Sequence, residues 1–152
     1  MQSRITPAEF ERLTQTLVGL PVSRTWRGAG SAIFLEVGTL RRTPQWRYGK
    51  GEFTIMAEWS WRVERPRSVL FGSFSASARI TNQLQKLTSE RVESVSLAGR
   101  LPELVVALSG SLWLHAFTTV EGQPQWALYL PDGSRICVHR GVLVRESEGV
   151  VP

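Results

Sequence analysis

The chain has 152 residues, of which 42% are hydrophobic and 20% are charged, and its formal net charge is +5. This composition excludes an intrinsically disordered chain, and the length suits one domain that buries about two-thirds of the surface exposed by the unfolded chain. Because there is one cysteine, Cys137, and no window approaches the ~20 apolar residues of a membrane span, we expect one domain, 1–152, in a reducing cytoplasm without membrane contact.

The first element predicted along the chain is a helix from Pro7 to Val18. Thr6 suits the N-cap, proline suits the first helical position, and Glu9 follows Thr6 by three residues and closes a capping box. Gly19 offers a left-handed C-terminal stop. The apolar residues that recur at helical spacing are Phe10, Leu13 and Leu17.

Segments with alternating apolar and polar residues follow this helix and predict strands. The longest alternation runs through residues 51–63 and places Trp59 and Trp61 on one face. A second helix is predicted from Ala78 to Thr88, and Pro-Asp-Gly at 131–133 predicts the turn of a late hairpin. The predicted strand segments are 32–38, 51–63, 68–74, 91–97, 103–109, 111–119, 125–130 and 134–139.

The two halves of the chain show the same order of elements, a helix followed by strands. Apolar positions align at an offset of 70 in the helices, 71 between 33–37 and 104–108, and 73 between 53–63 and 126–136. This drift is typical of a diverged duplication and predicts an internal repeat of residues 5–75 and 76–146, although two such segments could also align by pattern alone. The expected fold is α+β, a largely antiparallel sheet with two helices, built from two helix-plus-strands halves.

Residues that could carry catalytic or metal chemistry are sparse. The only aspartate, Asp132, is explained by the hairpin turn, and Cys137, His115 and His139 are the only Cys and His residues. Cys137 and His139 share a strand face with Arg135, which we interpret as a half-buried thiol beside a surface histidine; a nucleophilic Cys-His dyad is the alternative. His115 is interpreted as a core or cleft histidine with satisfied hydrogen bonds. The sequence therefore favours a non-enzymatic protein without metal or cofactor.

One segment, residues 41–50, combines cations with aromatic side chains between two predicted strands. Three interpretations stay open: a solvated hairpin loop, a protein contact rich in Trp, Tyr and Arg, or nucleic-acid binding through phosphates and stacked bases. The pair at 59 and 61 is interpreted as core, with an aromatic platform for a partner as the alternative. The candidate partner-binding residues are Arg41, Arg42, Trp46, Arg47, Tyr48, Lys50, Trp59 and Trp61.

Two short patterns carry a resemblance to a known group of domains. L-x-G-x-x-V from Leu17 to Val22, then short alternating strands, then W-x-L-x-x-P-D-G from Trp126 to Gly133 resembles small bacterial domains of unknown function, some of them immunity-protein-like. The resemblance covers parts of both halves, and the second copy, LTSERV, lacks the glycine. It implies a protein partner and no catalytic residues. We expect a non-enzymatic cytoplasmic binding protein, immunity- or accessory-protein-like; the alternative is a nucleic-acid-binding module that uses the 41–50 loop.

Overall fold

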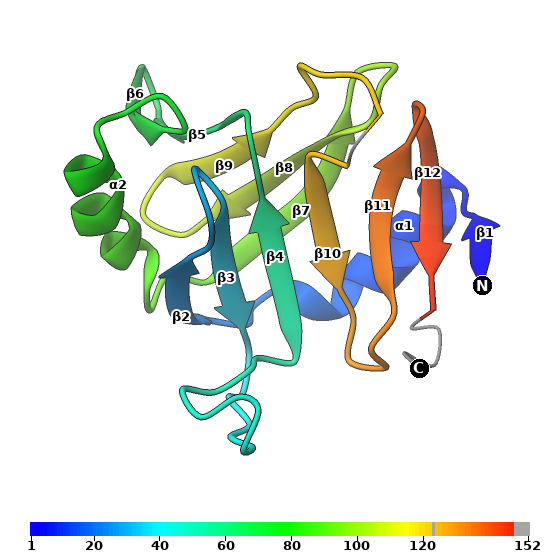
Figure 1. Cartoon of the computed structure of the whole chain (residues 1–152), viewed down its shortest axis with the longest axis horizontal. Helices are drawn as coiled ribbons and strands as arrows, with labels where there is room; N and C mark the ends of the chain where they lie inside the picture. Colours follow the sequence, from blue (N-terminus) through cyan, green and yellow to red (C-terminus); the bar gives the residue numbers. More distant parts are fainter. Residues whose placement is uncertain (123, 148–152) are drawn as a thin grey trace.

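A computed structural model describes residues 1–122 and 124–147, which form two antiparallel sheets and two helices and confirm the α+β prediction. The seven-stranded sheet contains, in spatial order, β1 (Gln2–Arg4), β12 (Val142–Glu146), β11 (Arg135–His139), β10 (Trp126–Tyr129), β4 (Phe53–Ala57), β3 (Ile33–Val37) and β2 (Val22–Arg27). The five-stranded sheet contains β6 (Ser68–Gly72), β5 (Trp61–Arg65), β9 (Leu112–Ala116), β8 (Glu103–Leu108) and β7 (Val92–Ala98). In Figure 1 the larger sheet lies in front of the smaller one.

Both predicted helices are present and each ends in a 3-10 turn. Helix α1 (Pro7–Thr14) continues into η1 (Gln15–Leu17), and α2 (Ser77–Leu84) continues into η2 (Gln85–Leu87). The N-cap prediction is confirmed, because the backbone N–H of Glu9 donates to Oγ1 of Thr6 at 3.1 Å. Gly19 follows with φ at +89°, the left-handed conformation expected of the stop. Among the described residues, no helix has the length and apolarity needed to cross a membrane.

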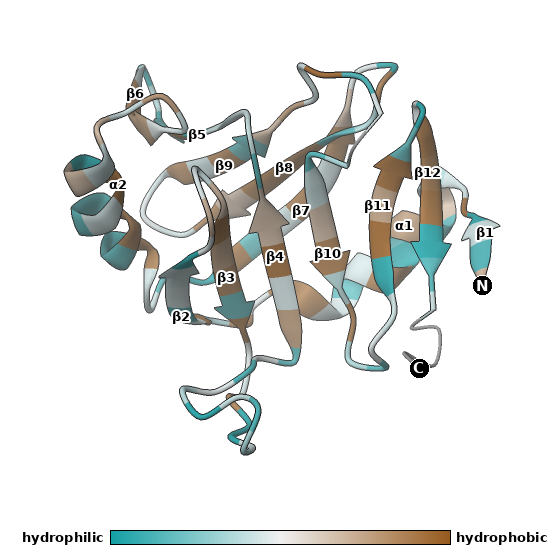
Figure 2. Ribbon diagram, in the orientation of Figure 1, coloured by the Kyte–Doolittle hydropathy of each residue, from teal (hydrophilic) through white to brown (hydrophobic). Residues whose placement is uncertain are grey.

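One hydrophobic core joins both sheets and both helices. Phe10 and Leu17 enter it from α1 and η1, and Ile80 and Leu84 enter it from α2. In Figure 1, α1 lies behind β10 and β11, and α2 lies at the edge formed by β2 and β6. Figure 2 shows the apolar residues along the strands, whereas the long loop below β3 and β4 is mainly hydrophilic. The site described below therefore stands on a rigid two-sheet scaffold.

Each half of the chain contributes strands to both sheets. β2, β3 and β4 form a meander in the seven-stranded sheet, and the chain then crosses at residues 58–60 to form the β5–β6 hairpin in the five-stranded sheet. β7, β8 and β9 form the corresponding meander in the five-stranded sheet, and the β10–β11 hairpin that follows lies in the seven-stranded sheet. Because β4 pairs with β10 and β5 pairs with β9, each meander is joined to the hairpin of the other half.

The two halves also match in local detail. The first strand pair of each half has a bulge immediately after its first residue, Val22 in β2 and Val92 in β7. Hydrogen bonds between the halves are reciprocal: the amide of Gly19 donates to the carbonyl of Val92 at 2.7 Å, and the amide of Ser89 donates to the carbonyl of Val22 at 2.8 Å. An offset of 70 relates each of these residues to its equivalent. These matches fall within the two segments of the predicted repeat, and the repeat itself stays a prediction.

Beyond β3, the strand pairing in the structure does not follow the sequence alignment that placed residues 53–63 on 126–136 at an offset of 73. By pairing, β4 corresponds to β9, since β4 pairs with β3 and β10 as β9 pairs with β8 and β5. The predicted strand 51–63 is interrupted at the crossing, where Trp59 has φ at +65°. Trp59 is 53% exposed, whereas Trp61 is 1% exposed. The indole N–H of Trp61 donates a hydrogen bond to the carbonyl of Ser31 at 2.9 Å. The interpretation as core is therefore confirmed for Trp61 and wrong for Trp59, and the two side chains do not form the exposed aromatic platform that was the alternative.

Candidate functional site

The basic loop, defined as residues 38–52, is the feature in which the two halves differ most. It joins β3 to β4 with 15 residues, whereas three residues, 109–111, join β8 to β9. The strand ends pair in the same way, Val37 with Phe53 and Leu108 with Leu112. A three-residue turn therefore suffices for this register, and the additional residues are not needed for the connection. Long ordered loops on a rigid scaffold commonly carry function.

Backbone contacts hold the basic loop in a defined conformation. Arg41 and Lys50 exchange two hydrogen bonds, of 2.8 and 2.9 Å, and so extend the hairpin beyond β3 and β4. At the base of the loop, a Cβ atom on Gly51 would lie 2.6 Å from both N and O of Val37, so only glycine fits there. The loop is thus a structured projection.

A fully buried carboxylate, Glu36 of β3, fastens the base of the loop to the sheet. Its Oε1 accepts hydrogen bonds from the backbone N–H of Gly51 at 3.0 Å and from Oγ1 of Thr54 at 2.6 Å. Its Oε2 accepts a hydrogen bond from Nε1 of Trp26 at 2.8 Å. The equivalent position in the other half, at the offset of 71, is Ala107. The anchor therefore occurs in the half that carries the long loop.

The aromatic side chains of the basic loop are exposed and lie beside cations. Tyr48 is 61% exposed, and the guanidinium carbons of Arg24 and Arg47 lie 5.3 and 5.0 Å from its ring centroid. Trp46 is 37% exposed, and Nζ of Lys50 lies 5.1 Å from its ring. These cation–π contacts restrict long side chains without neutralising their charge. The cations remain available to an outside group.

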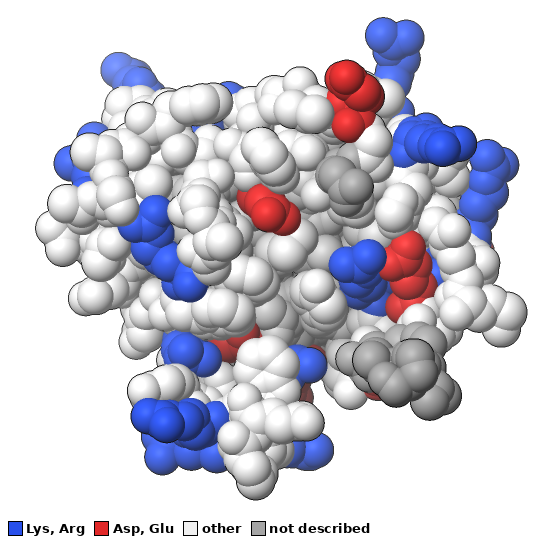
Figure 3. Space-filling model, viewed as in Figure 1, with Lys and Arg blue, Asp and Glu red and all other residues white. Residues whose placement is uncertain are grey.

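Positive charge is concentrated on this projection. Its four cations are Arg41, Arg42, Arg47 and Lys50, and within residues 1–122 and 124–147 none of them takes part in an ion pair. A hollow of about 390 Å³ separates the loop from the β10–β11 turn, with Arg41, Trp46 and Lys50 in its wall. Figure 3 shows the basic groups gathered on the projection at the bottom of the view. The local field favours an acidic ligand.

The predicted partner-binding residues fall into three places. The six residues of the 41–50 segment lie together on the basic loop, although Lys50 is partly covered. Trp59 lies at the other end of β4, at the crossing between the sheets. Trp61 lies in the core. The loop is therefore the one cluster among the predicted residues.

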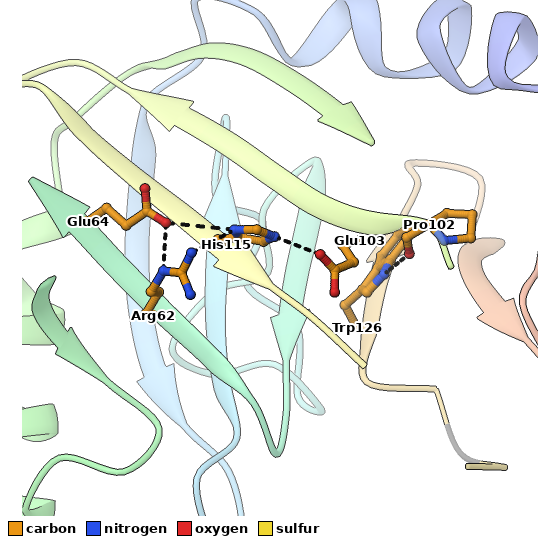
Figure 4. A network of polar contacts seen from close by, with 6 residues as sticks. All are labelled: Arg62, Glu64, Pro102, Glu103, His115 and Trp126. Carbon is orange, nitrogen blue, oxygen red and sulfur yellow. Dashed lines mark hydrogen bonds and ion pairs between the residues drawn. The ribbon is translucent and has the colours of Figure 1, made fainter. Parts of the chain in front are cut away.

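The outer face of the five-stranded sheet carries a network around His115 (Figure 4). Its Nε2 lies 3.2 Å from Oε1 of Glu103, and its Nδ1 lies 3.7 Å from Oε2 of Glu64, which also forms an ion pair with Arg62 at 2.7 Å. His115 thus has the polar partners that were predicted, but it lies on the outer sheet face and not in the core. The network links β5, β9 and β8 as a cross-strand charge ladder.

A second polar cluster lies on the outer face of the β11–β12 hairpin. Arg135, Cys137 and His139 share this face as predicted, and Glu146 of β12 joins them, with Oε1 2.8 Å from Nε2 of His139. Cys137 is fully buried, and burial raises the pKa of its thiol to about 11. Burial acts to raise the pKa of Glu146, but the hydrogen bond and charge of Arg135 hold it below its ordinary value. A thiol in this state is not an activated nucleophile, so the geometry does not favour the Cys-His dyad.

No protein-family model, curated protein or solved structure matches the chain. The resemblance to immunity-like bacterial domains therefore stays an expectation.

Proposed function

We propose that the chain is a binding protein whose basic loop contacts an acidic surface of another protein. The observation that carries the proposal is the loop itself: 15 residues where the equivalent connection needs three. Neutralising or accompanying a second protein, as immunity and accessory proteins do, is the specific form that we expect. The expected location is the cytoplasm.

The loop has the composition and rigidity of a protein contact. Trp, Tyr and Arg provide much of the binding free energy at protein interfaces, and a contact that is already ordered loses less conformational entropy on binding. Tyr48 and Trp46 are held beside cations, and the buried carboxylate of Glu36 fixes the loop base. Unpaired cations on such a projection attract a carboxylate-rich surface and accelerate association with it.

A protein partner is favoured over nucleic acid by two observations. Single-stranded nucleic acids bind through free aromatic faces along a basic groove. Here cations already lie over the rings of Trp46 and Tyr48. On the outer face of β10–β12, Ala127, Cys137 and Val144 form an apolar cluster, with Met56, Tyr129 and Val142 packed against it.

The experiment compares two charge-reversed variants that differ only in position. The double variant Arg41→Glu with Arg42→Glu changes the loop, and Arg65→Glu with Arg67→Glu makes the same change of charge in the exposed end of the β5–β6 hairpin. Immobilised full-length chain is incubated with lysate of the native host, and retained proteins are quantified by mass spectrometry. We expect a partner that is retained by the wild type and the control variant but lost with the loop variant.

A second variant replaces residues 38–52 by Ser-Gly-Ser, the sequence of 109–111, and tests whether the fold is independent of the loop. Retention of the same proteins by wild type and loop variants would refute the proposal, as would the absence of any retained protein. Salt-sensitive binding of single-stranded RNA or DNA that is lost only in the loop variant would assign the loop to nucleic acid instead.

A further inference from the structure

The β11–β12 hairpin brings together three side chains of the kinds that bind transition metals. Cys137 and His139 are two residues apart on β11, so both point to the outer face. Glu146 reaches the same place from β12, which pairs with β11 in antiparallel register. One ligand atom from each residue lies within 4.8 Å of the other two.

The three ligand atoms form a floor and a rim. Cys137 is fully buried among Ala127 and Val144, so its sulfur lies at the floor. The side chains of His139 and Glu146 are 32% and 23% exposed and form the rim above it. An ion that entered between them would contact the sulfur from the solvent side.

The two rim residues are in close contact. Nε2 of His139 is buried and lies 2.8 Å from Oε1 of Glu146, at ion-pair distance, and it has no other partner within the described part of the chain. The other carboxylate oxygen, Oε2, accepts a hydrogen bond from Nε of Arg135 at 2.7 Å. Arg135 therefore orients the carboxylate and leaves Oε1 beside the imidazole, as partners of metal ligands commonly do.

We infer that Cys137, His139 and Glu146 bind a zinc-type divalent transition-metal ion. Thiolate and imidazole ligands select zinc and similar metals over magnesium and calcium, and three protein ligands leave a fourth position for water. The thiol releases its proton when the ion binds. The thiolate and carboxylate then balance the charge of the ion, and Arg135 remains paired with Glu146.

The test is titration of the full-length chain with cobalt(II), followed by competition with zinc(II). We expect one ion per chain, with the near-ultraviolet absorption of a cobalt–thiolate bond and visible bands of tetrahedral cobalt. Cys137→Ser abolishes the thiolate band, and His139→Ala and Glu146→Gln each weaken binding more than about tenfold. His139 lies at the half-exposed rim, so its variant tests the site even if the change at buried Cys137 impairs folding.

The matched control is His115→Ala, because His115 also lies between carboxylates but has no cysteine beside it. This variant is expected to bind cobalt as the wild type does. Absence of a thiolate band in the wild type at a large excess of cobalt would overturn the inference. Unchanged binding in His139→Ala, or equal loss in His115→Ala, would overturn it as well.

Discussion

Replacing Glu36 should release the basic loop before it unfolds the domain. The buried carboxylate accepts three hydrogen bonds, from Trp26, Gly51 and Thr54. Glu36→Gln keeps the size but presents an N–H₂ group to at least one of these donors, and an unsatisfied buried donor costs about 1–3 kcal/mol. Glu36→Ala leaves all three donors without this acceptor and should cost roughly 3 kcal/mol or more.

Urea denaturation measures the global effect, and limited trypsin digestion at the arginines of the basic loop measures the local one. If loop opening is fast relative to cleavage, a local cost of about 1–3 kcal/mol corresponds to cleavage about 5- to 150-fold faster. Glu103→Gln is the control, because Glu103 is a partly exposed carboxylate on the equivalent strand pair and should cost at most about 1 kcal/mol. Equal stability and equal cleavage of the Glu36 variants and the wild type would refute the anchoring role.

Three further predictions concern other parts of the structure. Trp61 pairs with Ala116 of β9 and Trp126 pairs with Ala57 of β4, so the two tryptophans occupy equivalent positions. Trp61→Phe and Trp126→Phe each remove an indole hydrogen bond to a turn carbonyl and should each cost about 1–3 kcal/mol in urea denaturation; a cost confined to one of them would contradict this equivalence. Cys137 should react with iodoacetamide near neutral pH about 100-fold more slowly than a free thiol, and rapid labelling of the folded chain would contradict its burial. Hydrogen bonds from Ser134 and the charge of Arg145 lower the pKa of Asp132 below its ordinary value of 3.8. The ionised carboxylate therefore stabilises the folded chain above pH 3.8, and this stabilisation is lost as the pH falls through the lowered pKa. Asp132→Asn should therefore cost up to about 1 kcal/mol near neutral pH and almost nothing in strong acid, and a cost that did not change with pH would contradict this origin.

Local patterns in the sequence predicted the helices because capping, helical spacing and stop residues act within a few residues of one another. Thr6, Pro7 and Gly19 are found in the roles that the sequence predicts for them. The turn at Asp132 was predicted for the same reason, and its side chain accepts the hydrogen bond from the backbone N–H of Ser134 at 2.9 Å. Three strands of the seven-stranded sheet were not predicted: β1 and β2, which form its two edges, and β12, which lies beside β1. β1 has only three residues, and β2 and β12 lack a regular alternation of apolar and polar residues.

Tertiary structure decided where the chain changes sheets. The apolar alternation keeps its phase through residues 51–63, so the sequence alone predicts one strand with Trp59 and Trp61 on one face. Both sheets bury their inner residues in the same core. The alternating apolar residues before and after the crossing are therefore all buried, although they belong to two different strands. The left-handed backbone of Trp59, which marks the crossing, leaves no signal in the spacing of apolar residues.

The sequence by itself determined the composition of the candidate site: the cations and aromatic residues of the loop are adjacent along the chain, so they share one projection in any hairpin. Only the tertiary structure showed that the loop is longer than its connection requires and that it is anchored to the sheet. The match between the halves shows that three residues could close the same register, and the pairing of β3 with β4 places the carboxylate of Glu36 under the loop. Pairing of β11 with β12 likewise carries Glu146 to Cys137 and His139. Such contacts depend on which strands become neighbours, and that choice is made by the packing of the shared core rather than by local sequence.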